Sequence, residues 1–102
     1  MSYLASQRAY RRSVAARHAN VVASLAEARL HLREAKAERR AIVAGEIEGD
    51  AGIAWTNEER AEARVDTITD LESSLYQQLW DLDADIAEAA ACVRAEKAFY
   101  AA

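Results

Sequence analysis

The three glycines of this 102-residue chain all fall within one short stretch, at Gly45, Gly49 and Gly52, and the chain contains no proline. Glycine accepts the left-handed backbone conformation that ends many helices, and a proline would interrupt a helix anywhere else. The sequence therefore offers one place for the chain to turn, with long uninterrupted stretches on either side. This pattern predicts an all-α protein built as a long antiparallel two-helix hairpin.

The expected boundaries follow from the position of the glycines. We expect a first helix over about residues 2–44, a glycine-containing loop over about 45–55 and a second helix over about 57–100, within one domain of residues 1–102. The segment that begins at Thr56 and ends at Glu59 matches a capping box, with Thr56 as the N-cap of the second helix. Alanine, which has the highest helix propensity, supplies about half of the apolar residues.

Apolar residues recur along both predicted helices with alternating spacings of three and four. This spacing is typical of helices that pack along a shared seam, as in coiled coils. On the first helix the repeat comprises Leu4, Val14, His18, Val21, Leu25, Ala28, Leu32, Ala35 and Ile42. On the second helix it comprises Ala61, Val65, Ile68, Leu71, Leu75, Leu79, Leu82, Ile86, Ala89 and Val93. We expect these two faces to pack against each other.

The two halves of the chain carry opposite charge. Residues 1–44 hold nine Arg and Lys against three Glu, a net charge of +6, whereas residues 45–102 hold four against fourteen, a net charge of −10. Folding back near residue 50 would place residues whose numbers sum to about 100 at one level. Arg29, Arg33, Lys36 and Arg40 would then face Glu59, Glu62, Asp66 and Asp70, and Arg8, Arg11, Arg12 and Arg17 would face Asp81, Asp83, Asp85 and Glu88. Such pairs favour the antiparallel register.

A second apolar stripe remains on each helix after the seam is assigned. Its predicted interface residues are Ala23, Ala26, Leu30 and Ala37 on the first helix and Tyr76, Trp80, Ala87 and Ala91 on the second. Alanines can also occupy surface positions simply as good helix formers, but Leu30, Tyr76 and Trp80 are unfavourable to leave in water together. A two-helix hairpin also has little interior of its own. We therefore expect a homo-oligomer, with a dimer forming a four-helix bundle favoured, or a helical protein partner.

Two other binding functions remain open from the sequence. Arg8, Arg11, Arg12 and Arg17 could contact the phosphates of a nucleic acid, although the chain as a whole is acidic. The acidic second helix could instead inhibit a basic host protein by imitating nucleic acid. The leading hypothesis is a structural, adaptor or assembly role through protein–protein interaction in a bacterial or phage setting.

The sequence contains no recognisable catalytic motif, so we expect no enzymatic activity, no cofactor and no metal. His18 lies on the seam, and Glu27, His31 and Glu34 share a helix face with spacing that only weakly resembles a metal site. The single cysteine, Cys92, excludes an intramolecular disulfide. No membrane span is expected, and the predicted location is cytoplasmic, or virion-associated if the chain is phage-encoded.

Overall fold

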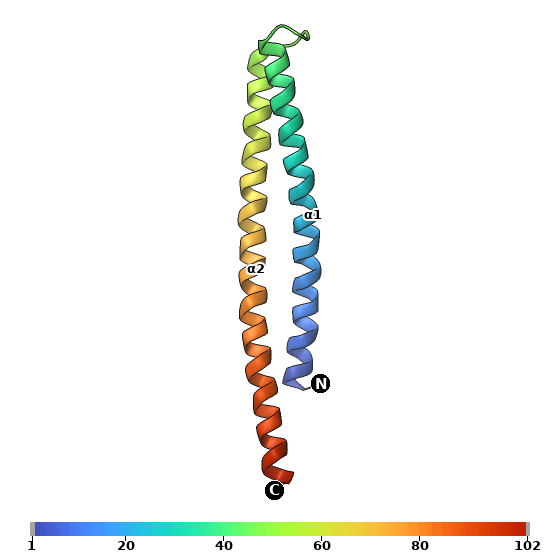
Figure 1. Ribbon diagram of the computed structural model, residues 1–102, viewed down its shortest axis with the longest axis vertical. Helices are drawn as coiled ribbons and strands as arrows, with labels where there is room; N and C mark the ends of the chain where they lie inside the picture. Colours follow the sequence, from blue (N-terminus) through green and yellow to red (C-terminus); the bar gives the residue numbers. More distant parts are fainter. Residues whose placement is uncertain (1, 102) are drawn as a thin grey trace. The chain divides into compact units, whose positions relative to one another are not determined.

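The computed structural model describes residues 2–101 and confirms an all-α helical hairpin. Helix α1 spans Tyr3–Val43 and helix α2 spans Ala51–Ala101, with no strand among the described residues. Figure 1 shows the two helices joined by a single short turn. Ser2 caps α1, because its Oγ accepts a hydrogen bond from the backbone N–H of Ala5 at 3.1 Å.

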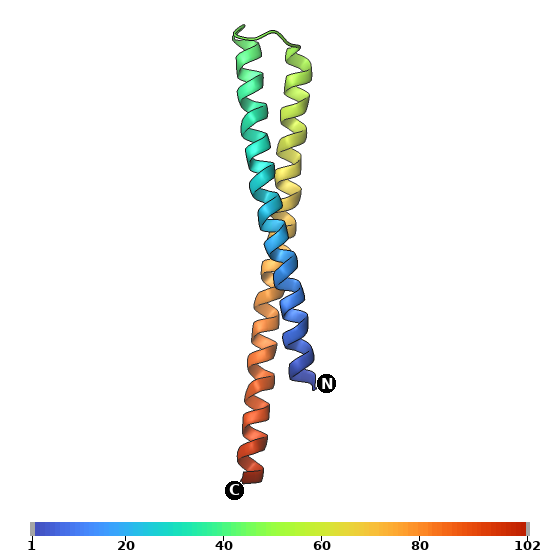
Figure 2. The same cartoon turned by 90° about the vertical axis from the view of Figure 1, so that its right-hand side faces the viewer.

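The hairpin separates into two compact units, and both helices contribute to each. The turn unit comprises residues 20–72 and therefore contains the turn between α1 and α2. The terminal unit comprises, among described residues, 2–19 of α1 with 73–101 of α2. Within each unit the α1 and α2 segments run antiparallel and side by side, as both views show (Figures 1 and 2).

An unbroken spacing of three and four residues links buried or half-buried side chains along both helices. On α1 these seam positions are Leu4, Gln7, Arg11, Val14, His18, Val21, Leu25, Ala28, Leu32, Ala35, Arg39 and Ile42, all buried or half-buried. On α2 they are Ala54, Glu58, Ala61, Val65, Ile68, Glu72, Leu75, Leu79, Leu82, Ile86, Ala89 and Val93. The predicted seam is thus confirmed on α1, and the structure adds polar members that hydrophobicity alone would not select.

The prediction is wrong at one seam position of α2. Leu71 is 46% exposed, and Glu72 occupies the half-buried position between Ile68 and Leu75. The reason is geometric, since the step from Ile68 must be four residues if the alternation of three and four is to continue. The larger apolar side chain therefore lies outside the seam, and a carboxylate-bearing side chain lies in it.

The start of α2 also differs from the prediction. The helix begins at Ala51 rather than near residue 57, and its N-cap is Asp50, whose Oδ1 accepts a hydrogen bond from the N–H of Ile53 at 3.0 Å. Thr56 lies inside the helix, and its hydroxyl donates to the carbonyl of Gly52 at 3.0 Å. The predicted cap at Thr56 is therefore wrong. Gly52 interrupted the helical pattern in the sequence, but in the first turn of a helix it is readily accommodated.

The turn is fixed by its glycines and by backbone hydrogen bonds. Gly45 adopts φ 74°, the left-handed conformation that ends α1, as predicted for a glycine at this place. The N–H of Glu46 donates to the carbonyl of Ala41 at 2.9 Å, and that of Gly45 donates to Ile42 at 3.1 Å. A Cβ added at Gly49 would lie 2.6 Å from the Cδ1 of Ile42, so the turn packs closely onto the end of α1.

Candidate interaction surfaces

The eight residues predicted to form an interface are all exposed in the single chain. In the terminal unit, Trp80 is 64% exposed and Tyr76 is 53% exposed. Ala87 and Ala91 continue the same side of α2 at helical spacing. We call these four residues, Tyr76, Trp80, Ala87 and Ala91, the Trp80 face. The chain itself leaves this face open to water.

The other four predicted residues lie in the turn unit. Leu30 is 50% exposed, and Ala23, Ala26 and Ala37 are exposed around it. Val22, which the prediction did not include, is a further half-exposed apolar side chain at 45%. Ala23, Ala26, Leu30 and Ala37 follow one another at helical spacing along α1 within the turn unit.

The four arginines proposed to contact nucleic acid fall into two classes. Arg11 is half-buried in the seam and donates to both carboxylate oxygens of Asp83, from Nε at 2.6 Å and from a terminal guanidinium nitrogen at 3.3 Å. The hydrogen bond from Arg11 holds the pKa of Asp83 below its ordinary value. Arg8, Arg12 and Arg17 are exposed and have no ion pair among residues 2–101. The predicted charge matching thus yields one ion pair here and leaves three arginines available.

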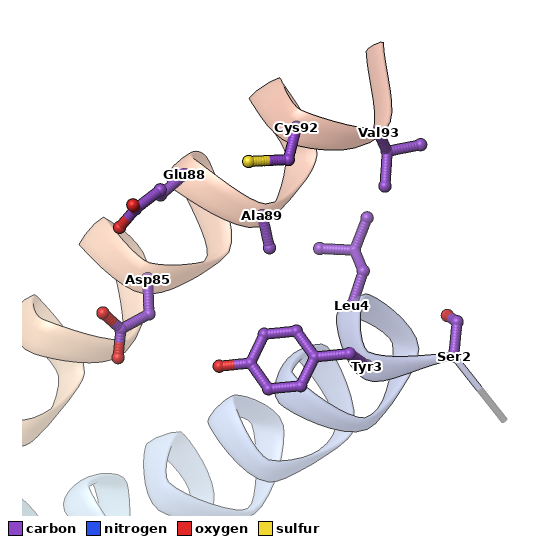
Figure 3. A pocket seen from close by; sticks show the side chains of 8 residues that line it. All are labelled: Ser2, Tyr3, Leu4, Asp85, Glu88, Ala89, Cys92 and Val93. Carbon is purple, nitrogen blue, oxygen red and sulfur yellow. The ribbon is translucent and has the colours of Figure 1, made fainter. Parts of the chain in front are cut away.

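An open groove in the terminal unit was not predicted from the sequence. Its volume is about 470 Å³, and Figure 3 shows the side chains that line it. Leu4 and Val93 lie at one end of this groove, and the carboxylates of Asp85 and Glu88 lie at the other, with the hydroxyl end of Tyr3 beneath them. The remaining lining residues are Ser2, Ala89 and the exposed Cys92. The groove therefore combines an apolar end with an anionic end.

A buried ion pair lies in the turn unit and was also missed. Arg39 donates to Glu58 from Nε at 2.7 Å and from a terminal guanidinium nitrogen at 3.3 Å, and the two side chains are only 18% and 8% exposed. The Trp55 ring lies against this guanidinium, 4.1 Å from centroid to carbon. The hydrogen bonds from Arg39 lower the pKa of Glu58, and the charges of Lys36 and Arg40 lower it further, against the opposing effect of burial. A sequence signal existed, because both residues fall on the three-and-four spacing.

A second groove in the turn unit gathers opposite charges. His31, Glu34 and Glu38 of α1 line it together with Arg60 and Arg64 of α2, and its volume is about 420 Å³. Two of the three residues weighed as a weak metal site therefore lie beside arginines. Within residues 2–101, no group of three or more His, Cys, Asp or Glu side chains is arranged to hold a metal ion.

Comparison with other proteins identifies no relative for this chain. No protein-family model matches it, and neither curated proteins nor solved structures give a significant match. Over the described residues, neither α1 nor α2 contains an apolar stretch long enough to cross a bilayer.

Proposed function

We propose that this chain is a non-enzymatic helical-hairpin protein that acts through protein–protein interaction, in a structural, adaptor or assembly role. The observation that supports this proposal is the exposure of the large aromatic side chains on the Trp80 face. Trp80 and Tyr76 are more than half exposed, whereas four of the eight buried apolar residues are alanines. Large exposed apolar patches on a protein surface commonly mark sites where another protein binds.

The polar character of the seam supports the same proposal. Positions that would be apolar in a self-sufficient helical pair hold Arg11, Arg39, Glu58 and Glu72. Each of these polar side chains buries less apolar area than an aliphatic side chain would at the same position. Burial of apolar area stabilises a fold by about 25 cal/mol per Å², so the seam loses part of this stabilisation. Burial of the Trp80 face against another helical chain, in coiled-coil or four-helix-bundle packing, would add the apolar contact that the seam lacks.

A photocrosslinking amino acid at position 80 tests the proposal in the organism that encodes the chain. We expect crosslinks to a protein, either a second copy or another chain, that a matched probe at Leu71 does not give. Leu71 is a suitable control because it is also apolar and half exposed but lies outside the Trp80 face. If position 80 crosslinks to no protein while the variant is fully folded, the proposal is wrong.

Nucleic-acid binding is the second candidate, and the exposure of Arg8, Arg12 and Arg17 is the observation that favours it. Phosphate contacts of this kind would make affinity for duplex DNA fall steeply as salt is raised. We expect any such affinity to disappear when Arg8 and Arg12 are replaced by Gln, as measured by fluorescence anisotropy with labelled DNA. Absence of binding at low salt would remove this candidate.

A further inference from the structure

The charges of the terminal unit are distributed by helix. Its α1 segment contains Arg8, Arg11, Arg12 and Arg17 and no acidic residue, whereas its α2 segment contains more acidic than basic residues. The Arg11–Asp83 contact joins the two segments as an ion pair, and Arg8, Arg12 and Arg17 have no ion pair among residues 2–101. Most of the opposite charge in this unit is therefore not neutralised within the chain.

Arg8 and Arg12 lie on the opposite side of the seam from Asp85 and Glu88. The Arg11–Asp83 contact defines one side. At 3.6 residues per turn, Arg8 and Arg12 fall on that side of α1, and the Trp80 face falls on that side of α2. The groove defines the other side, because Asp85 and Glu88 line it together with Tyr3. One side of the terminal unit thus carries Arg8, Arg12 and the exposed Trp80 indole. The other side carries the groove with Asp85 and Glu88, and Arg17 falls on that side of α1, about 180° from Arg8.

These two sides match in shape, charge and spacing. The groove volume of about 470 Å³ lies within the range of about 300–1,000 Å³ over which protein pockets bind organic groups. Arg8 and Arg12 are four residues apart on α1, and Asp85 and Glu88 are three residues apart on α2. Both spacings are close to one helical turn of about 5.4 Å, so the two arginines can meet the two carboxylates in register. Leu4 and Val93 supply an apolar wall for an aromatic ring.

We propose that the groove of the terminal unit binds the Trp80 face of a second copy of this chain. The Trp80 ring of one copy enters the groove of the next, and the guanidinium groups of Arg8 and Arg12 pair with the carboxylates of Asp85 and Glu88. This inference rests on the proposed function and names its partner. Because two different surfaces meet, the contact is heterologous and can repeat, which produces open-ended assemblies rather than a closed dimer.

The symmetric alternative is electrostatically unfavourable. If two Trp80 faces met each other, the uncompensated Arg8 and Arg12 of both copies would be brought to one interface, and like charges in contact repel. Contact between the groove and the Trp80 face instead places these guanidinium groups against carboxylates. The four-helix dimer favoured by the sequence is therefore replaced in this proposal by a directional contact.

Charge reversal in purified protein tests the contact. We expect the average mass of the unchanged chain to rise with concentration in sedimentation equilibrium at low salt. Arg8→Glu with Arg12→Glu should give monomers, and so should Asp85→Lys with Glu88→Lys. An equimolar mixture of the two variants, or all four changes in one chain, should restore association, because the reversed charges again match. A matched control, Glu27→Lys with Glu34→Lys, alters charge in the turn unit and should associate like the unchanged chain.

All four reversed side chains are exposed, so each variant should remain helical. Circular dichroism checks this, and a loss of association can then be assigned to the contact itself. A closed dimer that survives either reversal overturns the inference. An unchanged chain that stays monomeric at every concentration also overturns it, but leaves the proposed function standing if position 80 crosslinks to a different protein. Binding of duplex DNA by Arg8 and Arg12 without self-association would overturn it in favour of the nucleic-acid candidate.

Discussion

The turn unit and the terminal unit share one seam spacing but build it from different side chains. Four of the five buried apolar residues of the turn unit are alanines, at positions 28, 35, 54 and 61, whereas the terminal unit buries Val14, Leu75 and Leu82. Each unit also contains a two-point Arg–carboxylate contact, with nearly equal distances. These contacts differ in burial, at 18% and 8% for Arg39 and Glu58 against 39% and 56% for Arg11 and Asp83.

The position of the acid explains the difference in burial. Glu58 occupies a seam position, so the facing helix covers it, whereas Asp83 lies beside the seam. Alanine neighbours also allow close approach of the two helices in the turn unit, since they carry little side-chain volume. The two ion pairs have similar hydrogen-bond geometry but differ in strength, because water and salt screen the more exposed Arg11–Asp83 pair.

The largest expected effect comes from shortening the large side chains of the terminal unit. Leu75→Ala or Leu82→Ala should lower the free energy of unfolding by about 2–5 kcal/mol, through lost burial and the cavity that remains. Urea denaturation at one fixed protein concentration measures this loss. Leu71→Ala is the control, because Leu71 is half exposed and its change should stay within about 0.5 kcal/mol. Equal losses for Leu75→Ala and Leu71→Ala would contradict the assigned seam.

The turn unit should respond to the opposite change. Ala28→Leu or Ala61→Leu adds volume where two helices already pack closely and should cost about 1–3 kcal/mol. Thermal unfolding followed by circular dichroism gives the comparison, with Ala26→Leu as a control at an exposed position of α1. A stabilising effect of Ala28→Leu would mean that the alanine seam contains unfilled space.

The two ion pairs predict different responses to acid. The pKa of Glu58 is lowered from its ordinary value of 4.5, so its contribution to stability is complete above that pH and is lost as the pH falls through the lowered value. The pKa of Asp83 is likewise lowered from its ordinary value of 3.8, but the Asp83 side chain is more exposed than that of Glu58. We expect Glu58→Gln to flatten the acid limb of a stability–pH profile more than Asp83→Asn does. Equal flattening would show that burial does not distinguish the pairs.

The smallest effect separates the observed cap from the predicted one. Asp50→Ala removes the acceptor for the N–H of Ile53 and should destabilise the turn unit by about 1 kcal/mol. Thr56→Ala removes only a hydroxyl that bonds back to Gly52, and its effect should be a few tenths of a kcal/mol. Chemical denaturation of the two variants checks the order. A larger loss for Thr56→Ala would restore the predicted cap.

Sequence reasoning predicted the features that depend on local preference and periodicity. The glycine positions predicted the turn, and apolar spacing predicted every α1 seam position that was named. The Arg11–Asp83 level was also predicted correctly. Hydrophobicity favours Leu71 as the seam residue, whereas strict three-and-four spacing favours Glu72, which the structure shows half-buried. The segment from Thr56 to Glu59 matches a capping box, and this local pattern favours a helix start six residues beyond the observed cap at Asp50.

The grooves could not be predicted, because each requires residues far apart in the chain. Leu4 and Val93 meet only when the register of the two helices is known to within a residue or two. The predicted register paired residues whose numbers sum to about 100. The observed pairs have smaller sums, 97 for Arg39 and Glu58 and 94 for Arg11 and Asp83. The eight predicted interface residues are exposed in the single chain, and their role as an interface stays a prediction.

The unbroken alternation of three and four also limits how relatives of this chain can change in length. One inserted residue in α1 would rotate everything beyond it by about 100° and turn the seam toward water. An insertion of seven residues in α1, matched by seven in α2, would preserve the phase of both helices. A hairpin of this kind can therefore change length most readily by adding or deleting paired heptads, and a single inserted residue should be tolerated only in the turn.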